Sequence, residues 1–406
     1  MRVLLISNLY PPYIIGGMEI YLQNVVQRLS VTGEISLITT APFSGKASLK
    51  PKLSREGNVK IYRFFPINVY HQYKRSNSSV LKTIWYLLDV YNIHTRQVVR
   101  QVLREEKPDI VHTHNLRGLS ISAWDAVKDA GLPLIHTLHD YHFLCRNSLL
   151  LHGKDARFCD GNDIVCRFYR PLMRRLTGSK PEAVLAPSQF VLDQFKQAGF
   201  FHGVDLAVLP LWADDPDDSE MGTSYGGSLQ VLYMGTVSRH KGVRYLISAF
   251  LQLRDDNAQL EIVGSGDREL DECRLLAQHD KRIRFLGFVS GDEKEKAFAR
   301  ANVVVLPSIW YDNSPVIIYE SLARGKPVVA SRIGGIPELV QHEYNGLLFE
   351  PRNVGDLAAC LARLGNDREL WNSLARNAKA SSARFTAEAH MQGLLQIYRS
   401  VTTNCV

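Results

Sequence analysis

The amino-acid sequence predicts an α/β protein with two domains, each built on a parallel sheet that helices cover on both faces. The chain has 406 residues, which is roughly twice the size of an ordinary single-core domain. Short apolar, β-branched runs alternate with helical patterns along the whole chain, as expected for parallel strands joined by crossover helices. One acidic, Gly/Ser-rich segment, residues 213–228, interrupts this alternation and has the composition of a linker.

The first domain is expected to span residues 1–212. Its strand candidates are short β-branched runs at Val3–Ile6, Ile35–Thr39, Val59–Phe64, Ile110–Thr113, Leu134–Thr137 and Ala183–Ala186. Helical patterns separate them at Glu19–Leu29, Val80–Arg104 and Ser120–Ala130. The first run looks superficially like a signal peptide, but Asn8 and Pro11-Pro12 end it after a few residues. We therefore expect a buried strand there and a cytoplasmic protein.

The second domain is expected to span residues 229–384. Its strand candidates are the runs Val231–Met234, Leu260–Val263, Ile283–Leu286, Val303–Leu306 and Val328–Ala330. Ligands of doubly wound sheets bind at the carboxyl ends of the strands, so two such domains facing each other would bind a ligand in the cleft between them. No uninterrupted apolar stretch of about 18 residues is present, and we expect no membrane-spanning helix.

Charge is distributed unevenly along the chain. Residues 1–186 hold 25 Lys and Arg against 14 Asp and Glu, whereas the remaining residues hold 23 against 27. A basic first half suggests contact with an anionic partner, which could be a membrane surface, a lipid phosphate or a nucleic acid. The alternative is ordinary charge that keeps the protein soluble.

Three cysteines, Cys145, Cys159 and Cys166, lie in one region of the first domain. Their spacing does not match a zinc finger. Three interpretations remain open: structural thiols, a metal site completed by His142 or His152, and a redox role. The following stretch, residues 166–176, mixes basic and aromatic residues, which suits a membrane surface, a single-stranded nucleic acid or a solvated helix face.

The segment Leu306–Leu339 carries the strongest functional pattern. A strand ends at Leu306, a loop with Asp312 follows, and Pro315 opens a helix at a position where its missing N–H costs nothing. The free N–H groups of that helix start can bind an anion such as a diphosphate. Glu320 lies about 1.5 turns further along the same helix. Gly334-Gly335 forms a second turn, where backbone can approach a ligand closely.

Two further loops of the second domain follow strand ends. In Leu232–Gly242 the strand ends at Gly235, and Lys241 lies at the start of a helix, where a cation is well placed to bind phosphate. The other loop, Gly264–Asp267, is an ordinary strand-to-helix turn with an acidic cap.

The first domain offers a glycine loop and a set of histidines. Gly16-Gly17 starts the helix after the first strand, so its backbone can face a phosphate or a sugar. It is not a dinucleotide fingerprint, because no second Gly-x-x-Gly follows and no acid ends the second strand. The histidines lie at or near strand ends: His112, His114, His136 and His139. Their spacing matches no common metal site, and we expect none.

The block around Asp312 and Glu320 resembles the nucleotide-sugar signature of the family 4 glycosyltransferases, in which seven residues separate two acids. The flanking motifs also match: Pro307-Ser308, Gly325–Val328 and Gly334–Glu338. The resemblance implies the GT-B fold, with two Rossmann-like doubly wound domains facing across a cleft. It assigns the acceptor to residues 1–212 and the donor to residues 229–384, with the final helix, about 385–406, packing back on the first domain.

The resemblance also implies roles for individual residues. Asp312 would contact donor-sugar hydroxyls, Lys241 the diphosphate and His139 the anomeric region, and these three are the expected catalytic residues. The expected donor-binding residues, with Glu320 on the ribose, are Gly16, Gly17, Arg239, Gly264, Gly266, Val289, Asn313, Ser314, Pro315, Val316 and Glu320. The acceptor-side candidates are Glu19, His114 and Asn115.

Two positions depart from the family pattern. The first acid is usually Glu, and here it is Asp312, whose reach is one methylene shorter. An arginine usually follows the glycine of the Lys241 loop, and here Thr236 takes its place. Arg239 is close enough in sequence to substitute for that arginine.

The expected activity is therefore retaining, metal-independent sugar transfer without a cofactor. A UDP-sugar is the first choice of donor and a GDP-sugar the second, with a glycan or lipid-linked acceptor in cell-surface polysaccharide or glycolipid synthesis. We expect a cytoplasmic protein that can be peripheral on the inner membrane face, and no nucleic-acid partner. Three alternatives remain: a sugar-nucleotide epimerase, a non-catalytic binding protein on the same scaffold, and a nucleic-acid-binding protein.

Overall fold

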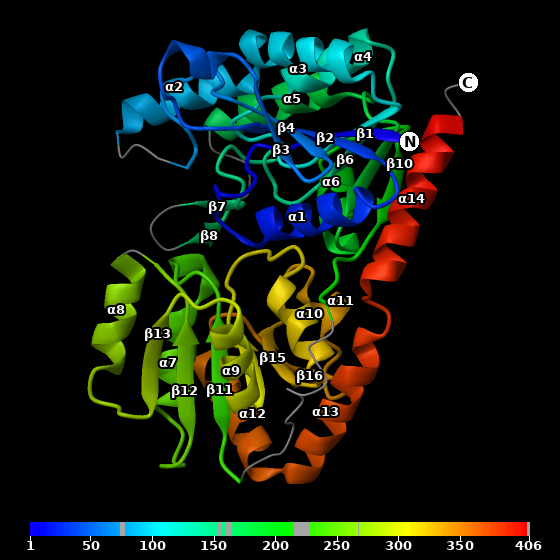
Figure 1. Ribbon diagram of the computed structural model, residues 1–406. Coiled ribbons are helices and arrows are strands. Elements are labelled where there is room, and N and C mark those ends of the chain that lie inside the picture. Colours follow the sequence, from blue (N-terminus) through cyan, green and yellow to red (C-terminus); the bar gives the residue numbers. More distant parts are fainter. Residues whose placement is uncertain (74–77, 153–155, 160–163, 215–226, 267, 404–406) are drawn as a thin grey trace. The chain divides into compact units, whose positions relative to one another are not determined.

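The computed structural model describes residues 1–73, 78–152, 156–159, 164–214, 227–266 and 268–403. The chain forms two compact units (Figure 1). The first comprises Met1–Leu150, Cys159–Leu209 and Met391–Val406, and the second comprises Leu151–Phe158 and Pro210–His390. Both are α/β units with mainly parallel sheets, which confirms the predicted fold class.

The sheet of the first unit has eight strands among the described residues, in the order β10-β9-β6-β5-β1-β2-β4-β3. Their bounds are β1 (Arg2–Ile6), β2 (Glu34–Thr40), β3 (Lys52–Glu56), β4 (Val59–Phe64), β5 (Ile110–Thr113), β6 (Leu134–Thr137), β9 (Ala183–Ala186) and β10 (Asp205–Val208). β3 pairs antiparallel with β4, and the pairs from β10 to β4 are parallel. The edge strands β3 and β10 were not predicted, because exposed edges lack a continuous apolar run.

The helices of the first unit are α1 (Gly17–Leu29), α2 (Ser79–Val90), α3 (Ile93–Glu106), α4 (Ser122–Asp129), α5 (Ile164–Thr177), α6 (Gln189–Gln197) and the greater part of α14 (Ala387–Thr403). The single helix predicted over Val80–Arg104 is wrong, since α2 and α3 are separate. Tyr91 is extended, and the Asn92 side chain accepts the Thr95 N–H at 3.1 Å. Asn92 thus starts a new helix inside a continuous apolar pattern.

The sheet of the second unit is parallel, with the described strands in the order β13-β12-β11-β14-β15-β16. Their bounds are β11 (Gln230–Met234), β12 (Gln259–Val263), β13 (Ile283–Gly287), β14 (Val303–Leu306), β15 (Val328–Ser331) and β16 (Gly346–Phe349). The helices are α7 (Val243–Phe250), α8 (Arg268–Ala277), α9 (Asp292–Arg300), α10 (Val316–Ala323), α11 (Ile336–Leu339), α12 (Val354–Asn366) and α13 (Arg368–Ser382). α7 and α12 pack in one hydrophobic cluster, and Phe298 of α9 packs in another.

The bounds of the units differ from the predicted domain limits at three places. Residues 385–390 were expected with the final helix on the first domain but belong to the second unit. Residues 210–212 belong to the second unit, where the Tyr319 hydroxyl accepts the Leu211 N–H at 3.2 Å. The hairpin of β7 (Leu151–His152) and β8 (Arg157–Phe158) also belongs there, because Phe158 stacks on Tyr311 with ring centroids 4.2 Å apart. Most of the predicted linker, residues 215–226, and the end of the last helix, residues 404–406, lie outside the described residues.

Candidate active site

Lys241 and Asp312 form an ion pair in the loops that follow β11 and β14. The Lys241 Nζ lies 2.7 Å from Asp312 Oδ2, and the Ser308 hydroxyl donates to the same oxygen at 2.9 Å. The Asp312 side chain is 7% exposed and that of Lys241 24%. The ammonium also lies 5.0 Å from the centroid of the Trp310 ring, which is a favourable cation–π distance. The two predicted catalytic residues of this unit are therefore held together.

The turn at Gly334-Gly335 fixes the backbone of Asp312. The Gly335 N–H donates to the Asp312 carbonyl at 2.8 Å. A Cβ at Gly334, whose φ is +62°, would lie 2.4 Å from that carbonyl oxygen and 2.7 Å from the Asp312 nitrogen. The sequence predicts that the backbone approaches a ligand closely at this turn. In the structure, the backbone of the turn packs closely against the loop that carries Asp312.

Among the described residues, the start of α10 has no side-chain cap at the N–H groups of Val316 and Ile317, whereas the Ile318 N–H donates to the Pro315 carbonyl at 3.0 Å. Pro315 precedes the helix with φ −66°, and in the described part of the chain no side chain caps this terminus. Ser314 is directed elsewhere, because its hydroxyl lies 2.5 Å from the Tyr319 hydroxyl. Asn313 and Ser314 are both buried, and α10 begins at Val316. An uncapped terminus of this kind attracts a phosphate.

Glu320 lies on α10 and is paired with a lysine of the neighbouring helix. Lys294 Nζ of α9 is 2.5 Å from Glu320 Oε1, and the Glu320 side chain is 18% exposed. A second pair, Arg324 with Glu295, joins the same helices at 2.7 and 2.8 Å. Lys294 is a site residue that the sequence did not indicate, because it lies 26 residues away on a helix with many other charges.

Gly264 and Gly266 allow two loops to pack directly against each other. A Cβ at Gly264, whose φ is +144°, would lie 1.9 Å from the Gly235 carbonyl oxygen, and one at Gly266 would lie 2.1 Å from that of Val237. Both were predicted to bind the donor. The facing loop fills the space where a Gly264 side chain would lie, whereas Gly266 lines a cavity, and donor binding at both glycines stays a prediction. Asp267, from the same predicted turn, lies outside the described residues.

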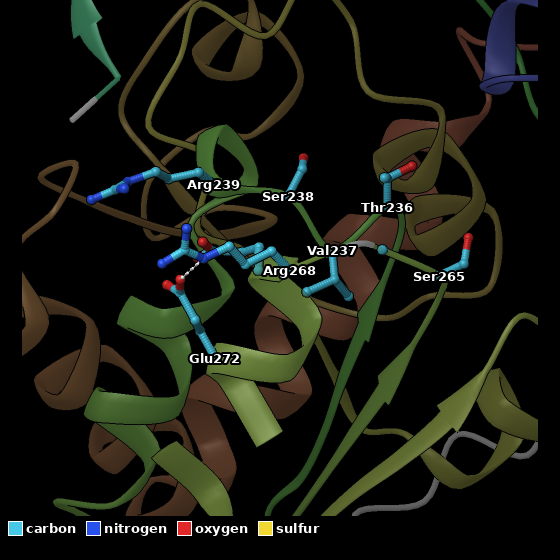
Figure 2. A pocket seen from close by; sticks show the side chains of 9 residues that line it. Thr236, Val237, Ser238, Arg239, Ser265, Arg268 and Glu272 are labelled. Atoms are coloured by element: carbon cyan, nitrogen blue, oxygen red, sulfur yellow. Dashed lines mark hydrogen bonds and ion pairs between the residues drawn. The ribbon is translucent and has the colours of Figure 1, made fainter. Parts of the chain in front are cut away.

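That cavity has a volume of about 630 Å³, which is the size of a small-molecule site (Figure 2). It is lined by the loops after β11 and β12 and the start of α8: Thr236, Val237, Ser238, Arg239, Ser265, Gly266, Arg268, Glu269 and Glu272. The Arg268 Nε lies 2.9 Å from Glu272 Oε1, as the dashed line in Figure 2 marks. Figure 2 shows Arg239 extending away from Thr236, so the proposed substitution of one for the other stays a prediction.

The family resemblance places Phe288-Val289, at the end of the next strand, near the base, and the two side chains differ in exposure. Val289 is partly buried and packs against the cluster that holds Leu232 and Val304. The preceding residue, Phe288, is 78% exposed. An exposed aromatic ring can stack on a base, so Phe288 is the better candidate of the two.

His114 and His139 of the first unit contact each other. His114 Nδ1 lies 3.0 Å from His139 Nε2, and Tyr21 of α1 packs against the His139 ring at 5.4 Å between centroids. His112 is bonded to the Tyr398 hydroxyl and to Thr137 Oγ1, both at 2.7 Å. Burial holds the pKa of His136 well below its ordinary value. His112 and His136 therefore serve the core, and His114 and His139 form the candidate site.

The Glu19 side chain is hydrogen-bonded to the backbone of the loop that precedes it. Its Oε2 accepts the N–H of Gly16 at 2.8 Å and that of Ile15 at 3.3 Å, and burial raises its pKa. The carboxyl group thus positions the glycine loop at the start of α1, and its predicted acceptor contact remains untested. A Cβ at Gly16 would meet nothing within 4 Å, and Gly17 begins the helix. Asn115 lines a small hollow together with His114 and His139.

The three cysteines of the first domain are free thiols. The Cys145 thiol donates to Asn147 Oδ1 at 2.8 Å, and burial raises its pKa. Cys166 is buried on α5, and Cys159 is half-buried. Within the described ranges, no three His, Cys, Asp or Glu side chains are placed to hold a metal ion together.

Asp89 and His142 form a buried pair that the sequence did not indicate. Asp89 is 2% exposed, its Oδ1 accepts the Gly118 N–H at 2.7 Å, and its Oδ2 lies 3.8 Å from His142 Nε2. Burial raises the pKa of Asp89 to about 7 and lowers the pKa of His142 to about 3. Between these values both groups are neutral, so the pair is a polar contact and not an ion pair.

We expect Asp89→Asn to stabilise the protein at pH 8 and to have little effect at pH 4. The folded carboxyl titrates near pH 7 and the unfolded one near its ordinary 3.8. The wild type therefore loses stability as pH rises through this window, because the folded state binds the proton that the unfolded state has released. The expected increase in the free energy of unfolding at pH 8 is a few kcal/mol, because each unit of pKa difference between the folded and unfolded states corresponds to about 1.4 kcal/mol. Urea unfolding at both pH values measures it.

Asp205→Asn is the control for this experiment, because Asp205 is exposed on β10 and should show no such pH-dependent difference. An equal gain for Asp89→Asn at pH 4 and pH 8 would contradict the assignment of a raised pKa.

Both halves of the chain match known families. Residues 16–212 match the glycosyl transferase 4-like domain, and residues 214–381 match the glycosyl transferases group 1. The chain belongs to the group 1 glycosyltransferases. A relative of this glycosyltransferase is an uncharacterized 42.6 kDa protein in the cps region of Klebsiella pneumoniae, 25% identical over 84% of this chain and 87% of the relative.

Solved structures of similar fold cover this glycosyltransferase from end to end. Sucrose-phosphate synthase from Thermosynechococcus elongatus superposes with a TM-score of 0.76 at 17% identity, and covers 100% of both chains. HepE from Anabaena, solved in complex with UDP-glucose, gives a TM-score of 0.70 at 22% identity over 98% of this chain and 100% of that one. The group 1 glycosyltransferase is therefore an enzyme built of two Rossmann-like α/β domains, as predicted.

Proposed function

We propose that this enzyme transfers a sugar, with retention of anomeric configuration, from a UDP-sugar to a glycan or lipid-linked acceptor in cell-surface polysaccharide or glycolipid synthesis. The observation that carries the proposal is the Lys241–Asp312 pair beside the uncapped start of α10. A cation and free N–H groups suit a diphosphate, and a carboxylate suits sugar hydroxyls. The UDP-glucose complex of HepE supports the choice of uridine. The cps region of the Klebsiella relative supports the pathway.

In the proposed reaction the donor's bond between the anomeric carbon and the diphosphate oxygen breaks, and a bond from the acceptor oxygen to that carbon forms on the same face. The acceptor's proton goes to the departing phosphate oxygen. Lys241 and the N–H groups of α10 stabilise the negative charge that develops on the diphosphate. Asp312 orients the sugar through its hydroxyls and Glu320 holds the ribose, and the family resemblance assigns His139 to the anomeric region.

The proposal needs neither a metal nor a cofactor. Lys241 and the helix start supply the positive charge that a divalent cation would otherwise bring to the diphosphate. For this reason the assays below contain EDTA, and activity that disappears in EDTA would contradict this part of the proposal.

We expect UDP to raise the melting temperature of the wild-type enzyme more than GDP or ADP in a thermal-shift assay with EDTA. A ligand at 100 times its Kd stabilises the folded state by about 2.7 kcal/mol, which is several degrees for a domain of this size. Glu320→Ala should abolish most of the shift, because the ribose loses its acceptor. Glu293→Ala is the matched control, since Glu293 is exposed on α9 and, within the described residues, forms an ion pair with Lys296 of its own helix and not with Glu320's partner Lys294.

The outcomes separate the candidate functions. No shift with any nucleotide at millimolar concentration would overturn the proposal in favour of a non-catalytic protein. A shift with UDP-sugar, together with sugar interconversion in the absence of an acceptor, would instead identify an epimerase.

A further inference from the structure

Helix α5 exposes apolar side chains that a buried helix would cover. Phe168 is 75% exposed, Ile164 71% and Leu172 45%. The opposite side of the helix is buried, with Cys166, Tyr169 and Met173 in contact with the core. α5 is thus apolar on both sides, although its outer side faces solvent. Exposed apolar groups gathered on one helix mark an interaction surface more often than chance.

Helix α2 repeats this feature in the same unit. Leu87 is 70% exposed, and Ile84 and Leu88 are each 39% exposed. Positions 84, 87 and 88 fall on one side of a helix because they follow the helical repeat. Trp85 and Asp89, by contrast, are buried. The outer side of α2 therefore carries a stripe of large apolar residues with no acidic residue in it.

The two helices are anchored to one short segment of the first unit. The Tyr169 hydroxyl of α5 donates to the His142 carbonyl at 2.8 Å, and the Asp89 carboxyl of α2 lies 3.8 Å from the His142 ring. Figure 1 shows α2 and α5 within this unit. We call Ile84, Leu87, Leu88, Phe168 and Leu172 the apolar face.

The charge beside the apolar face restricts what can cover it. α5 contains four arginines and no acidic residue over Ile164–Thr177. Arg167, Arg174 and Arg175 are exposed, and none of them forms an ion pair within the part of the chain that the structure describes. A second copy of the chain would bring these arginines against each other, which is unfavourable. Apolar groups flanked by exposed arginines suit an anionic lipid surface, where the rings enter the interface and the guanidinium groups bind lipid phosphates.

We propose that α2 and α5 dock this enzyme on an anionic lipid bilayer through the apolar face and the arginines of α5. The described residues contain no helix long and apolar enough to cross a membrane. The contact is therefore interfacial. The inference deepens the proposed function, on which it rests for its purpose, because docking would bring the enzyme to a lipid-linked acceptor. The binding itself requires neither donor nor acceptor.

The test is co-sedimentation of the full chain with vesicles, without nucleotide. One set of vesicles is phosphatidylcholine, and the other is an equimolar mixture with phosphatidylglycerol. We expect binding to the anionic vesicles only, weakening as salt is added. Arg175→Glu should lower the partition coefficient at least about fivefold, because each cationic side chain near an anionic surface contributes about 1 kcal/mol to binding. Phe168→Ser and Leu87→Ser should also weaken binding.

Matched controls lie in the second unit. Leu275 is 65% exposed on α8, and Arg254 is exposed after α7, so Leu275→Ser and Arg254→Glu should bind vesicles as the wild type does. The UDP-induced thermal shift of each variant reports whether it is folded.

Absence of vesicle binding in the presence of a normal UDP shift would overturn this inference and leave the proposed function intact. Vesicle binding without any nucleotide-induced thermal shift would support this inference and overturn the proposed function. Equal loss in the control variants, or binding of single-stranded RNA in place of vesicles, would also overturn it.

Discussion

Replacing Lys241 by methionine is expected to lower kcat/KM by about 10³-fold and to destabilise the second unit. The loss of activity follows from the removal of a cation placed to meet the charge on the departing diphosphate, for which losses of about 10²–10³ are typical. The loss of stability follows because the Asp312 carboxyl group, only 7% exposed, loses the ammonium that lies 2.7 Å from it. Steady-state kinetics and urea unfolding measure the two effects separately.

The double variant Lys241→Met/Asp312→Asn separates folding from catalysis. The Asp312→Asn substitution replaces the buried carboxyl group that has lost its cation by a neutral amide, so we expect stability to return towards that of the wild type while activity stays low. The neighbouring Ser308 can still donate to the remaining amide oxygen, as it does to Asp312 at 2.9 Å. Recovery of activity in the double variant, or wild-type activity in Lys241→Met, would show that the lysine has no part in the reaction.

Replacing Gly264 by alanine is expected to destabilise the second unit by about 3–5 kcal/mol, from overpacking and from backbone strain together. The new Cβ would lie 1.9 Å from the Gly235 carbonyl oxygen, and φ at this position is +144°. Relief requires the loops after β11 and β12 to separate, which also moves Thr236 and Val237 at the cavity. We therefore expect weaker nucleotide binding as well, measured by calorimetry on the folded fraction.

Gly287→Ala is the control for this clash. Its φ is +72°, but a Cβ there would meet nothing within 4 Å, so only backbone strain is added. We expect a loss of about 1 kcal/mol for this variant. Equal losses for Gly264→Ala and Gly287→Ala would contradict the close packing of the two loops.

Much of the fold could be predicted because its signals are local. Buried parallel strands are continuous apolar runs, and Val303–Leu306 and Ile110–Thr113 were placed with the bounds that the structure shows. The break between α2 and α3 could not be predicted from periodicity, since the apolar pattern continues through it and a single side chain, Asn92, decides it. The strand Gly346–Phe349 was missed because it is short and begins with glycine.

The candidate site divides in the same way. The acids Asp312 and Glu320 could be named because the whole block around them resembles the family signature and both lie close to one helix start. Their partners could not, since Lys294 reaches Glu320 from another helix and the pairing depends on tertiary packing. The glycines could be named, but the packing of Gly264 against the Gly235 carbonyl could not, because a sequence shows that a position tolerates close approach without showing what approaches it.

The pairing of Lys241 with Asp312 affects how strongly the site attracts the diphosphate at each step of the proposed reaction. A diphosphate that arrives must compete with a carboxylate already 2.7 Å from the ammonium, so the resting enzyme offers it an attenuated attraction. In the proposed reaction, the growing charge on the phosphate would draw the lysine more strongly than the carboxylate does, which would concentrate stabilisation in the transition state. After the nucleotide departs, the ion pair between Lys241 and Asp312 would form again and restore the resting site.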